Sequence, residues 1–262
     1  MLLSASNIAW TAENDLEMLV FLRDNGFAGL EIAPTRIFPE APYAKINEAG
    51  AFARRLWEEY GLKISSMQSI WYGKTQSVFG TKEEKEELIS YTNKASDFAE
   101  AISCENLVFG CPKNRNKPEG AVDESAIDFF RTIADYAHSR NTVISLEPNP
   151  IIYGTNFINT TQSAFNFVKK VGSPGLKVNI DMGTIIYNKE TLTQIETNFN
   201  HVNHIHVSEP GLERIEIKSI HQELAILLRS CHYKGYVSLE MKNLDDVCEA
   251  KKTALEMKEV FG

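Results

Sequence analysis

The sequence has no paired cysteines and no long apolar run. Its four cysteines stand apart without C-x-x-C spacing, which argues against a disulfide scaffold or a cysteine-rich zinc site and favours a reducing compartment. No apolar run approaches the ~20 residues that span a bilayer. The first ten residues lack the basic stretch of a signal peptide. We therefore expect a cytoplasmic protein without a membrane partner.

Basic charge is also scarce. The 262 residues include 27 Lys and Arg against 35 Asp and Glu, a formal net charge of −8. Such a chain repels a polyanion at long range, so we expect no nucleic-acid partner. The hydrophobic fraction of 43% and the charged fraction of 24% are those of an ordinary globular protein, which excludes collagen-like and disordered classes.

Short β-branched or apolar runs alternate with longer amphipathic segments about eight times along the chain. The runs lie at 2–9, 28–33, 62–70, 105–110, 142–148, 176–182, 201–207 and 235–241. The clearest helical segment is 82–103, preceded by Thr81, which forms a capping-box pattern with Glu84. Asp245 is the expected cap of the last helix.

This alternation predicts parallel strands joined by helical crossovers. Eight such units in a chain of this length match a (β/α)8 TIM barrel of the α/β class. A doubly wound sheet usually needs fewer strands, and no G-x-G-x-x-G follows the first run. No linker or low-complexity segment divides the chain, so we predict one TIM-barrel domain over 1–262.

The last four predicted strands depart from the continuous Val, Ile and Leu of parallel strands that are buried on both faces. Each carries two polar residues with one aliphatic residue between them. The pairs are Ser145 and Glu147, Asn179 and Asp181, His204 and His206, and Ser238 and Glu240. A period of two puts both members of a pair on one face. Because the aliphatic face must meet the helices, we expect the polar face to point into the barrel.

The second member of each pair ends its strand, at the face where TIM-barrel active sites lie. These residues are Glu147, Asp181, His206 and Glu240. Three carboxylates and an imidazole cannot all stay charged and unpaired in a confined mouth, so we predict a divalent cation. Oxygen-rich ligation with one nitrogen favours Mn²⁺, Mg²⁺ or Co²⁺ and also allows Zn²⁺. We expect Asn179 and His204, one layer below, to orient the ligands.

Other residues at the predicted strand ends and in the following loops are candidate substrate contacts. They are Glu31, Gln68, Trp10, Asn149, Lys113, Arg115 and Arg36. The cations among them would hold a phosphate or carboxylate group. Ordinary packing and solvated loop charge are the alternative explanations. Any single predicted ligand is likewise more often a strand-end cap, but the same phase on four consecutive strands favours a site.

The motifs SLEPNP around Glu147, NIDMGT around Asp181, HIHVSE around His206 and SLEMK around Glu240 resemble the xylose isomerase-like barrels, specifically their sugar-phosphate isomerase and epimerase group. The resemblance runs over essentially the whole chain. It implies that the four residues bind one divalent metal, with the two glutamates also acting as acid and base. Thr184 stands where many sugar epimerases of the group have a histidine, and Tyr153 where some ketose epimerases have a glutamate. Both departures argue against a free-ketose 3-epimerase.

We therefore predict a metal-dependent sugar or sugar-phosphate isomerase or epimerase. Glu147 and Glu240 would move a proton next to a carbonyl through an enediolate. Reactions like those of inosose dehydratase and hydroxypyruvate isomerase are alternatives within the same family. An AP endonuclease-like phosphodiesterase and a non-catalytic sugar-binding barrel are alternatives of another class. The expected partner is a small carbohydrate, and homo-oligomer formation stays open.

Overall fold

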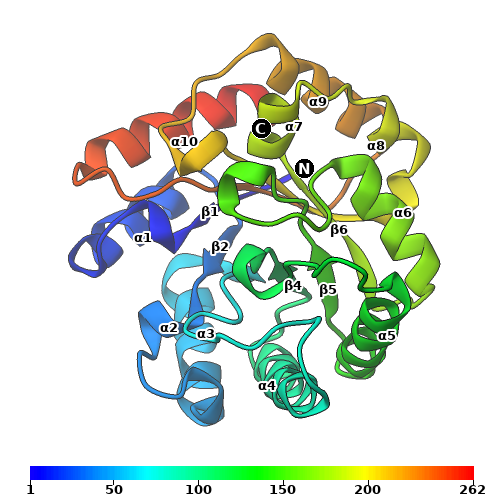
Figure 1. The fold of residues 1–262 in the computed structure, drawn as a ribbon. Coiled ribbons are helices and arrows are strands. Elements are labelled where there is room, and N and C mark those ends of the chain that lie inside the picture. The colour runs from blue at the N-terminus through cyan, green and yellow to red at the C-terminus, as the bar shows by residue number, and fades with distance from the viewer.

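Eight parallel strands close into a barrel in the computed structural model, which describes residues 1–262 (Figure 1). Each strand pairs with the next along the chain, and β8 pairs with β1. The strands are β1 Leu2–Ser6, β2 Gly29–Ile32, β3 Lys63–Met67, β4 Asn106–Phe109, β5 Val143–Leu146, β6 Leu176–Asp181, β7 Val202–Val207 and β8 Tyr236–Leu239. The predicted (β/α)8 barrel is confirmed.

The α-helices are α1 Asp15–Asp24, α2 Pro34–Ile37, α3 Ile46–Tyr60, α4 Lys82–Ala101, α5 Asp123–Ser139, α6 Thr161–Val171, α7 Met182–Asn188, α8 Thr193–Thr197, α9 Ser219–Ser230 and α10 Val247–Phe261. The longer helices surround the barrel, and the short helices α2 and α7 follow the ends of β2 and β6 (Figure 1). None of the helices is both long enough and apolar enough to cross a bilayer.

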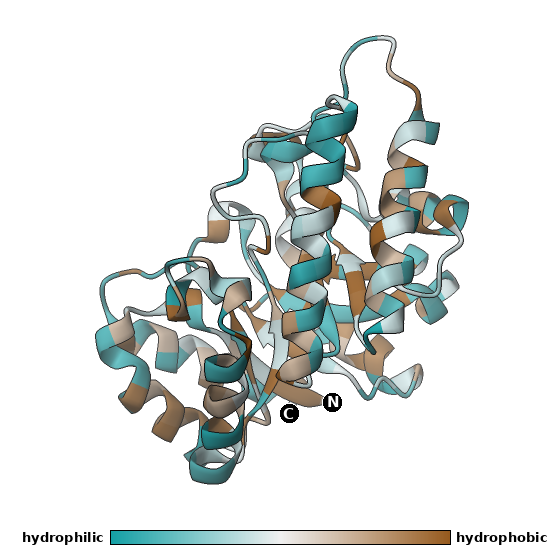
Figure 2. Ribbon diagram, turned by 90° about the horizontal axis from the view of Figure 1, so that it is seen from below, coloured by the Kyte–Doolittle hydropathy of each residue, from teal (hydrophilic) through white to brown (hydrophobic).

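An apolar layer fills the space between the strands and the helices. The aliphatic residue between each polar pair, such as Leu146, Ile180 and Ile205, is completely buried. The outer helices are banded in hydrophilic and hydrophobic residues (Figure 2), as expected of helices with one apolar face. The predicted phase of the strands is therefore correct, and their polar residues face the barrel interior.

The barrel interior is unusually polar. Hydrogen bonds join buried side chains of different strands, such as Ser4 on β1 with Ser65 on β3 at 2.6 Å and Asn106 on β4 with Ser66 on β3 at 2.9 Å. Others cross the barrel, since Nε2 of His206 on β7 lies 2.9 Å from Oε2 of Glu31 on β2. Buried polar groups need such partners, so this network fixes how the side chains beneath the barrel mouth are oriented.

Two helix caps test the expectations for helix starts. The Thr81 hydroxyl accepts the Glu84 N–H at 3.3 Å, and Glu84 accepts the Thr81 N–H at 2.8 Å, which confirms the capping box of α4. The expected cap at Asp245 is wrong by one residue, because Asp246 caps α10 by accepting the Cys248 N–H at 2.9 Å. Asp245 has a φ of 59°, whereas a capping residue needs the extended backbone that Asp246 adopts.

Candidate metal centre and substrate cavity

The ends of β5 to β8 bring the predicted ligands together. Glu147 and Glu240 directly follow β5 and β8, while Asp181 and His206 are paired residues of β6 and β7. The register between β6 and β7 shifts after Val178, and this irregularity sets Asp181 level with His206. One donor atom from each of the four residues lies within 4.8 Å of the other three, so the group could hold a metal ion.

His206 is the centre of this group. Its Nδ1 lies 2.9 Å from Oε1 of Glu147 and 3.0 Å from Oε2 of Glu240. Its Nε2 lies 2.9 Å from Oε2 of Glu31. An imidazole whose far nitrogen is held by a carboxylate has a fixed ring orientation, so Nδ1 is aimed at the two glutamates at the barrel mouth.

Asp181 is held by the start of α7 and by the residue that follows β7. Its Oδ2 accepts the Thr184 N–H at 2.7 Å, and the Thr184 hydroxyl lies 2.6 Å from the same oxygen. The Ser208 hydroxyl donates to Oδ1. The alternative expectation of a strand-end cap therefore holds for Asp181. These bonds also fix the carboxylate beside the other three donors.

The charges of the group depend on one another. Burial opposes the imidazolium of His206, yet Glu240, Glu31 and Glu147 raise its pKa well above the usual value. Burial, with the charge of Glu147 adding to it, raises the pKa of Glu240 to about 7 and also raises that of Asp181. Burial acts on Glu147 in the same direction, but its hydrogen bond with His206 lowers the pKa overall.

The donor set fits a divalent cation. Glu147, Asp181 and Glu240 are at most 8% exposed, and one imidazolium offsets only part of their charge. A buried carboxylate without a counter-charge is costly, which is why the Glu240 carboxyl keeps a proton up to about neutral pH. Three oxygen ligands and one nitrogen are the set that Mn²⁺, Mg²⁺ and Co²⁺ accept, and Zn²⁺ also accepts them.

Residues below the group hold it in place. Nδ2 of Asn179 donates to Oε1 of Glu147 at 2.8 Å, and Nε2 of His204 lies 3.1 Å from Oε2 of Glu31. Glu31 is completely buried, and although burial opposes its charged form, His206 and His204 hold its pKa well below the usual range. Glu31 therefore contacts the histidines of the barrel interior and does not line the cavity above them.

A cavity of about 210 Å³ opens above the group. Among the predicted substrate contacts, Gln68 and Asn149 line it. Its remaining walls are Ser69, Val108, Gly110, Cys111, Pro112, Tyr153 and Leu212, with Glu147, Asp181 and Glu240 on the inner side. Tyr153 accepts the Gly211 N–H at 2.8 Å and so joins the loops after β5 and β7. The loop residues Ser69, Cys111, Pro112 and Leu212 were not predicted, because loops have no periodic pattern.

Gly110 leaves room for the Glu147 carboxylate. A Cβ on Gly110 would lie 2.7 Å from Oε2 of Glu147, which is closer than real Cβ contacts. The sequence pattern gave no sign of this role, because a glycine after a predicted strand is ordinarily read as a turn residue.

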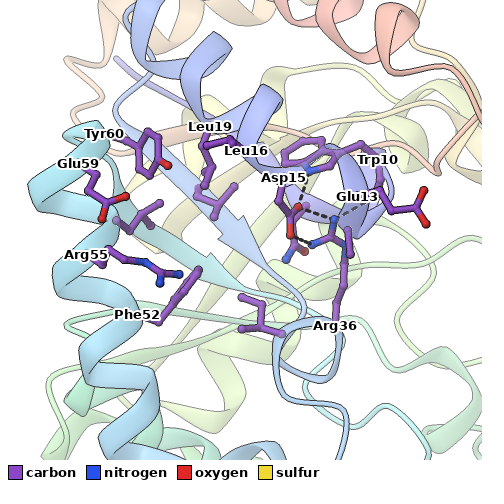
Figure 3. A pocket seen from close by; sticks show the side chains of 15 residues that line it. Trp10, Glu13, Asp15, Leu16, Leu19, Arg36, Phe52, Arg55, Glu59 and Tyr60 are labelled. Carbon is purple, nitrogen blue, oxygen red and sulfur yellow. Dashed lines mark hydrogen bonds and ion pairs between the residues drawn. The ribbon is translucent and has the colours of Figure 1, made fainter.

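The other predicted substrate contacts lie away from the cavity. Trp10 lines a separate groove of about 600 Å³ that also has walls from α1 and α3 (Figure 3). There its indole N–H donates to Asp15 at 2.8 Å, and Arg36 pairs with the same carboxylate at 2.6 Å. Lys113 is exposed to solvent, whereas Arg115 is completely buried. None of these four lines the cavity.

A family model described as "Xylose isomerase-like TIM barrel" matches residues 19–260. The chain belongs to this family. A comparison of the sequence with curated proteins finds no match.

Solved structures of this barrel type superpose on nearly the whole chain. The 3-keto-D-glucoside 4-epimerase YcjR of E. coli is 19% identical, with a TM-score of 0.78 and 99% of each chain covered. The D-psicose 3-epimerase of Clostridium cellulolyticum H10, solved with D-tagatose, is 16% identical, with a TM-score of 0.80 over 100% of this chain and 99% of that one. A family 2 AP endonuclease of Brucella melitensis is 21% identical, with a TM-score of 0.71 and 96% of each chain covered. At these low identities, the similarity shows a shared fold alone.

Proposed function

We propose that this protein is a divalent-metal-dependent isomerase or epimerase of sugars or sugar phosphates. The observation that carries the proposal is the placement of Glu147 and Glu240 against the same nitrogen of His206, at 2.9 and 3.0 Å. They come from β5 and β8, which are not neighbours in the barrel. Two carboxylates from different sides of one small cavity suit a proton transfer that removes and returns a proton.

Glu147 and Glu240 would carry out the two proton transfers. One glutamate takes the proton from the carbon next to the substrate carbonyl, and the electron pair of that C–H bond moves toward the carbonyl oxygen. The other glutamate returns a proton. Return to the opposite face of the same carbon is epimerisation. Return to the neighbouring carbon is isomerisation, in which the hydroxyl proton also moves to the former carbonyl oxygen so that a new carbonyl forms. Glu147 has one oxygen, Oε1, bonded to His206 and Asn179, and Oε2 on the side of Gly110 in the cavity wall. We assign Oε2 to the proton transfer.

Glu147, Asp181, His206 and Glu240 would hold the cation, through the donor atoms that already lie within 4.8 Å of one another. A divalent cation bound there would supply a Lewis acid for the negative charge that develops on the substrate oxygens. Glu31 would keep Nδ1 of His206 directed at the cation, because its carboxylate holds Nε2 at 2.9 Å. Asn179 would act in the same way on Oε1 of Glu147.

Two further points support a small carbohydrate as substrate. The cavity of about 210 Å³ has room for a small molecule, and its walls carry amide and hydroxyl groups from Gln68, Ser69 and Asn149 that suit sugar hydroxyls. The similar structures include proteins named as epimerases of a keto-glucoside and of psicose. Dehydration and hydroxypyruvate isomerisation begin with the same proton removal, so they stay within this proposal as variants of the second step.

A panel of ketoses, aldoses, their phosphates and inososes in D₂O with added Mn²⁺ tests the proposal. We expect deuterium at one carbon of at least one substrate, seen by NMR, and loss of that exchange when EDTA replaces Mn²⁺. Deuterium in an epimer of the substrate would identify epimerisation, deuterium in a constitutional isomer would identify isomerisation, and a deuterated water-loss product would identify dehydration. A panel with no exchange would contradict a proton-transfer enzyme, and Mn²⁺-dependent cleavage of an abasic-site oligonucleotide would favour the phosphodiesterase instead.

A further inference from the structure

Arg115 is a buried cation with very few polar contacts. It lies in the loop after β4 and is completely buried. The one hydrogen bond of its guanidinium runs from Nη2 to Oδ1 of Asn149, at 2.7 Å. Burial lowers the pKa of Arg115 to about 10, so it still carries its charge at neutral pH. A buried charge is costly, so a specific local use of this guanidinium is worth seeking.

The guanidinium decides which way the Asn149 amide points. An arginine side chain only donates hydrogen bonds, so the amide oxygen of Asn149 must face it. The amide nitrogen therefore faces Glu147, where Nδ2 donates to Oε2 at 3.1 Å. The positive charge of Arg115 also favours the carboxylate form of Glu147 and lowers its pKa.

The Glu147 carboxylate is thus held at both oxygens. His206 and Asn179 contact Oε1 at 2.9 and 2.8 Å, and Asn149 contacts Oε2. The contacts at Oε1 already oppose rotation about the Cγ–Cδ bond. The Asn149 contact adds a second restraint at Oε2, the oxygen beside Gly110, and Arg115 orients the amide that makes it.

We propose that Arg115 is a positioning residue that acts through Asn149 to fix the Glu147 carboxylate at the barrel mouth. This inference rests on the proposed function only in the role that it gives to Glu147. It replaces the expectation that Arg115 itself binds a substrate phosphate or carboxylate, because Arg115 does not line the cavity.

Mn²⁺ affinity, measured by calorimetry without any sugar, is the main test. Arg115→Met removes the charge and the donors while keeping an unbranched side chain, and Asn149→Ala removes the link to Glu147. We expect each variant to bind Mn²⁺ about 10-fold more weakly, which is typical when a group that orients a metal ligand is lost. Arg131→Met is the matched control, since Arg131 lies on α5 and pairs with Asp128 at 2.9 Å, and its affinity should equal that of the wild type.

The double variant decides whether Arg115 acts through Asn149. If it does, Arg115→Met has no further effect in the Asn149→Ala background, and the double variant binds Mn²⁺ like the weaker single variant. Losses that multiply to about 100-fold would overturn the proposal. Unchanged affinity in Arg115→Met would overturn it as well.

Two more conservative variants still test the proposal if Arg115→Met does not fold, which circular dichroism would detect. Arg115→Lys keeps a buried donor-only cation and should recover part of the affinity. Asn149→Leu keeps a similar side-chain shape but offers no donor to Oε2 of Glu147, and it should bind Mn²⁺ more weakly than Arg115→Lys does. The reverse order would contradict the proposal.

Exchange kinetics separate this inference from the proposed function. Where the wild type exchanges a sugar proton, we expect Arg115→Met to lower kcat about 10-fold at saturating Mn²⁺ with a KM change below about 2-fold, because Arg115 does not contact the sugar. A loss confined to KM would indicate substrate binding and overturn the inference. A wild type that binds Mn²⁺ but exchanges no sugar proton would contradict the proposed function and leave the affinity test of Arg115 intact.

Discussion

The Glu147 carboxylate has little free space around it, and hydrogen bonds hold both of its oxygens. Asn179 and His206 lie on the side of Oε1, and Asn149 lies against Oε2. The backbone of Gly110 also approaches Oε2 and leaves no room there for a Cβ. A carboxylate that both binds a cation and carries a proton needs its two oxygens in separate roles, so we expect small changes at Gly110 to have large effects.

Gly110→Ala should impair the site without unfolding the barrel. The new Cβ would lie 2.7 Å from Oε2 of Glu147 and would displace the carboxylate. We expect Mn²⁺ affinity, measured by calorimetry, to fall about 10-fold or more. Gly50→Ala is the matched control, because Gly50 lies inside α3 and its new Cβ would have 3.6 Å to the nearest atom. That variant should bind Mn²⁺ normally and gain about 0.5–1 kcal/mol in the free energy of unfolding. Equal Mn²⁺ affinity in the two variants would refute the role of Gly110.

The position of the four proposed ligands could be predicted because strand periodicity fixes which face a residue occupies. Periodicity does not fix how deep in the barrel a side chain lies, nor the path that a loop takes. Glu31 has the inward phase, but the register between β2 and β3 shifts at Leu30, and its side chain meets two histidines below the cavity. Trp10 follows β1, yet its loop turns outward and its indole bonds to Asp15 beside α1. Both outcomes depend on contacts between distant segments.

Helix starts are where short sequence signals act most directly. The capping box of α4 uses two side chains and two backbone N–H groups, and neither of its residues lines the cavity. Thr81→Ala removes the hydroxyl that accepts the Glu84 N–H. We expect the free energy of unfolding in urea to fall by about 1 kcal/mol, with Mn²⁺ affinity unchanged. A loss of Mn²⁺ binding would show that α4 is coupled to the site, contrary to this account.

The start of α9 should make stability depend on pH. His221 is completely buried and accepts the Lys218 N–H at Nδ1, at 3.0 Å. Burial lowers the pKa of His221 in the folded protein, partly offset by Glu209. As pH falls below about 6.5, the unfolded chain therefore takes up the proton first, and this contribution to stability is progressively lost.

His221→Gln isolates this contribution, because glutamine at the same position can accept the Lys218 N–H but does not titrate. Urea unfolding at pH 7.5 and pH 5.5 gives the change in free energy for each protein. The wild type should lose more stability than the variant, by at most about 1.4 kcal/mol per pH unit for one proton. Parallel losses would contradict the assignment.

The order of strands and helices followed from alternation alone, since each run of β-branched residues became one strand. Strand ends were predicted too long at several positions, for example 62–70 against the observed Lys63–Met67. Polar residues such as Gln68 continue the inward phase after the ladder of hydrogen bonds has ended. The pattern therefore extends into the loops that line the cavity, and only the bonds themselves mark the strand end.

The net charge of −8 has two parts with different consequences. Part of it lies on helix surfaces, as in α4, where residues 82–87 are solvent-facing or half-buried. Another part is concentrated in the buried carboxylates at the barrel mouth. The second part destabilises the folded chain unless a cation offsets it, so stability of the whole molecule should depend on divalent metal.

Adding Mn²⁺ to the EDTA-treated protein should raise its melting temperature. A ligand present at 100 times its Kd stabilises the folded state by about 2.7 kcal/mol, which corresponds to a rise of roughly 5–10 °C for a chain of this size. Differential scanning calorimetry measures the shift. Asp181→Asn, which removes one of the proposed ligands, should shift much less, and an equal shift in this variant would mean that Mn²⁺ binds elsewhere.

The most direct measurement compares deuterium exchange by the wild type, Glu147→Gln and Glu240→Gln, all saturated with Mn²⁺. Saturation must be verified by metal analysis, so that a loss of exchange cannot be a loss of metal. If the two glutamates move the proton, each variant should exchange the substrate proton at least about 100-fold more slowly than the wild type. Wild-type exchange rates in both metal-loaded variants would contradict proton transfer by Glu147 and Glu240.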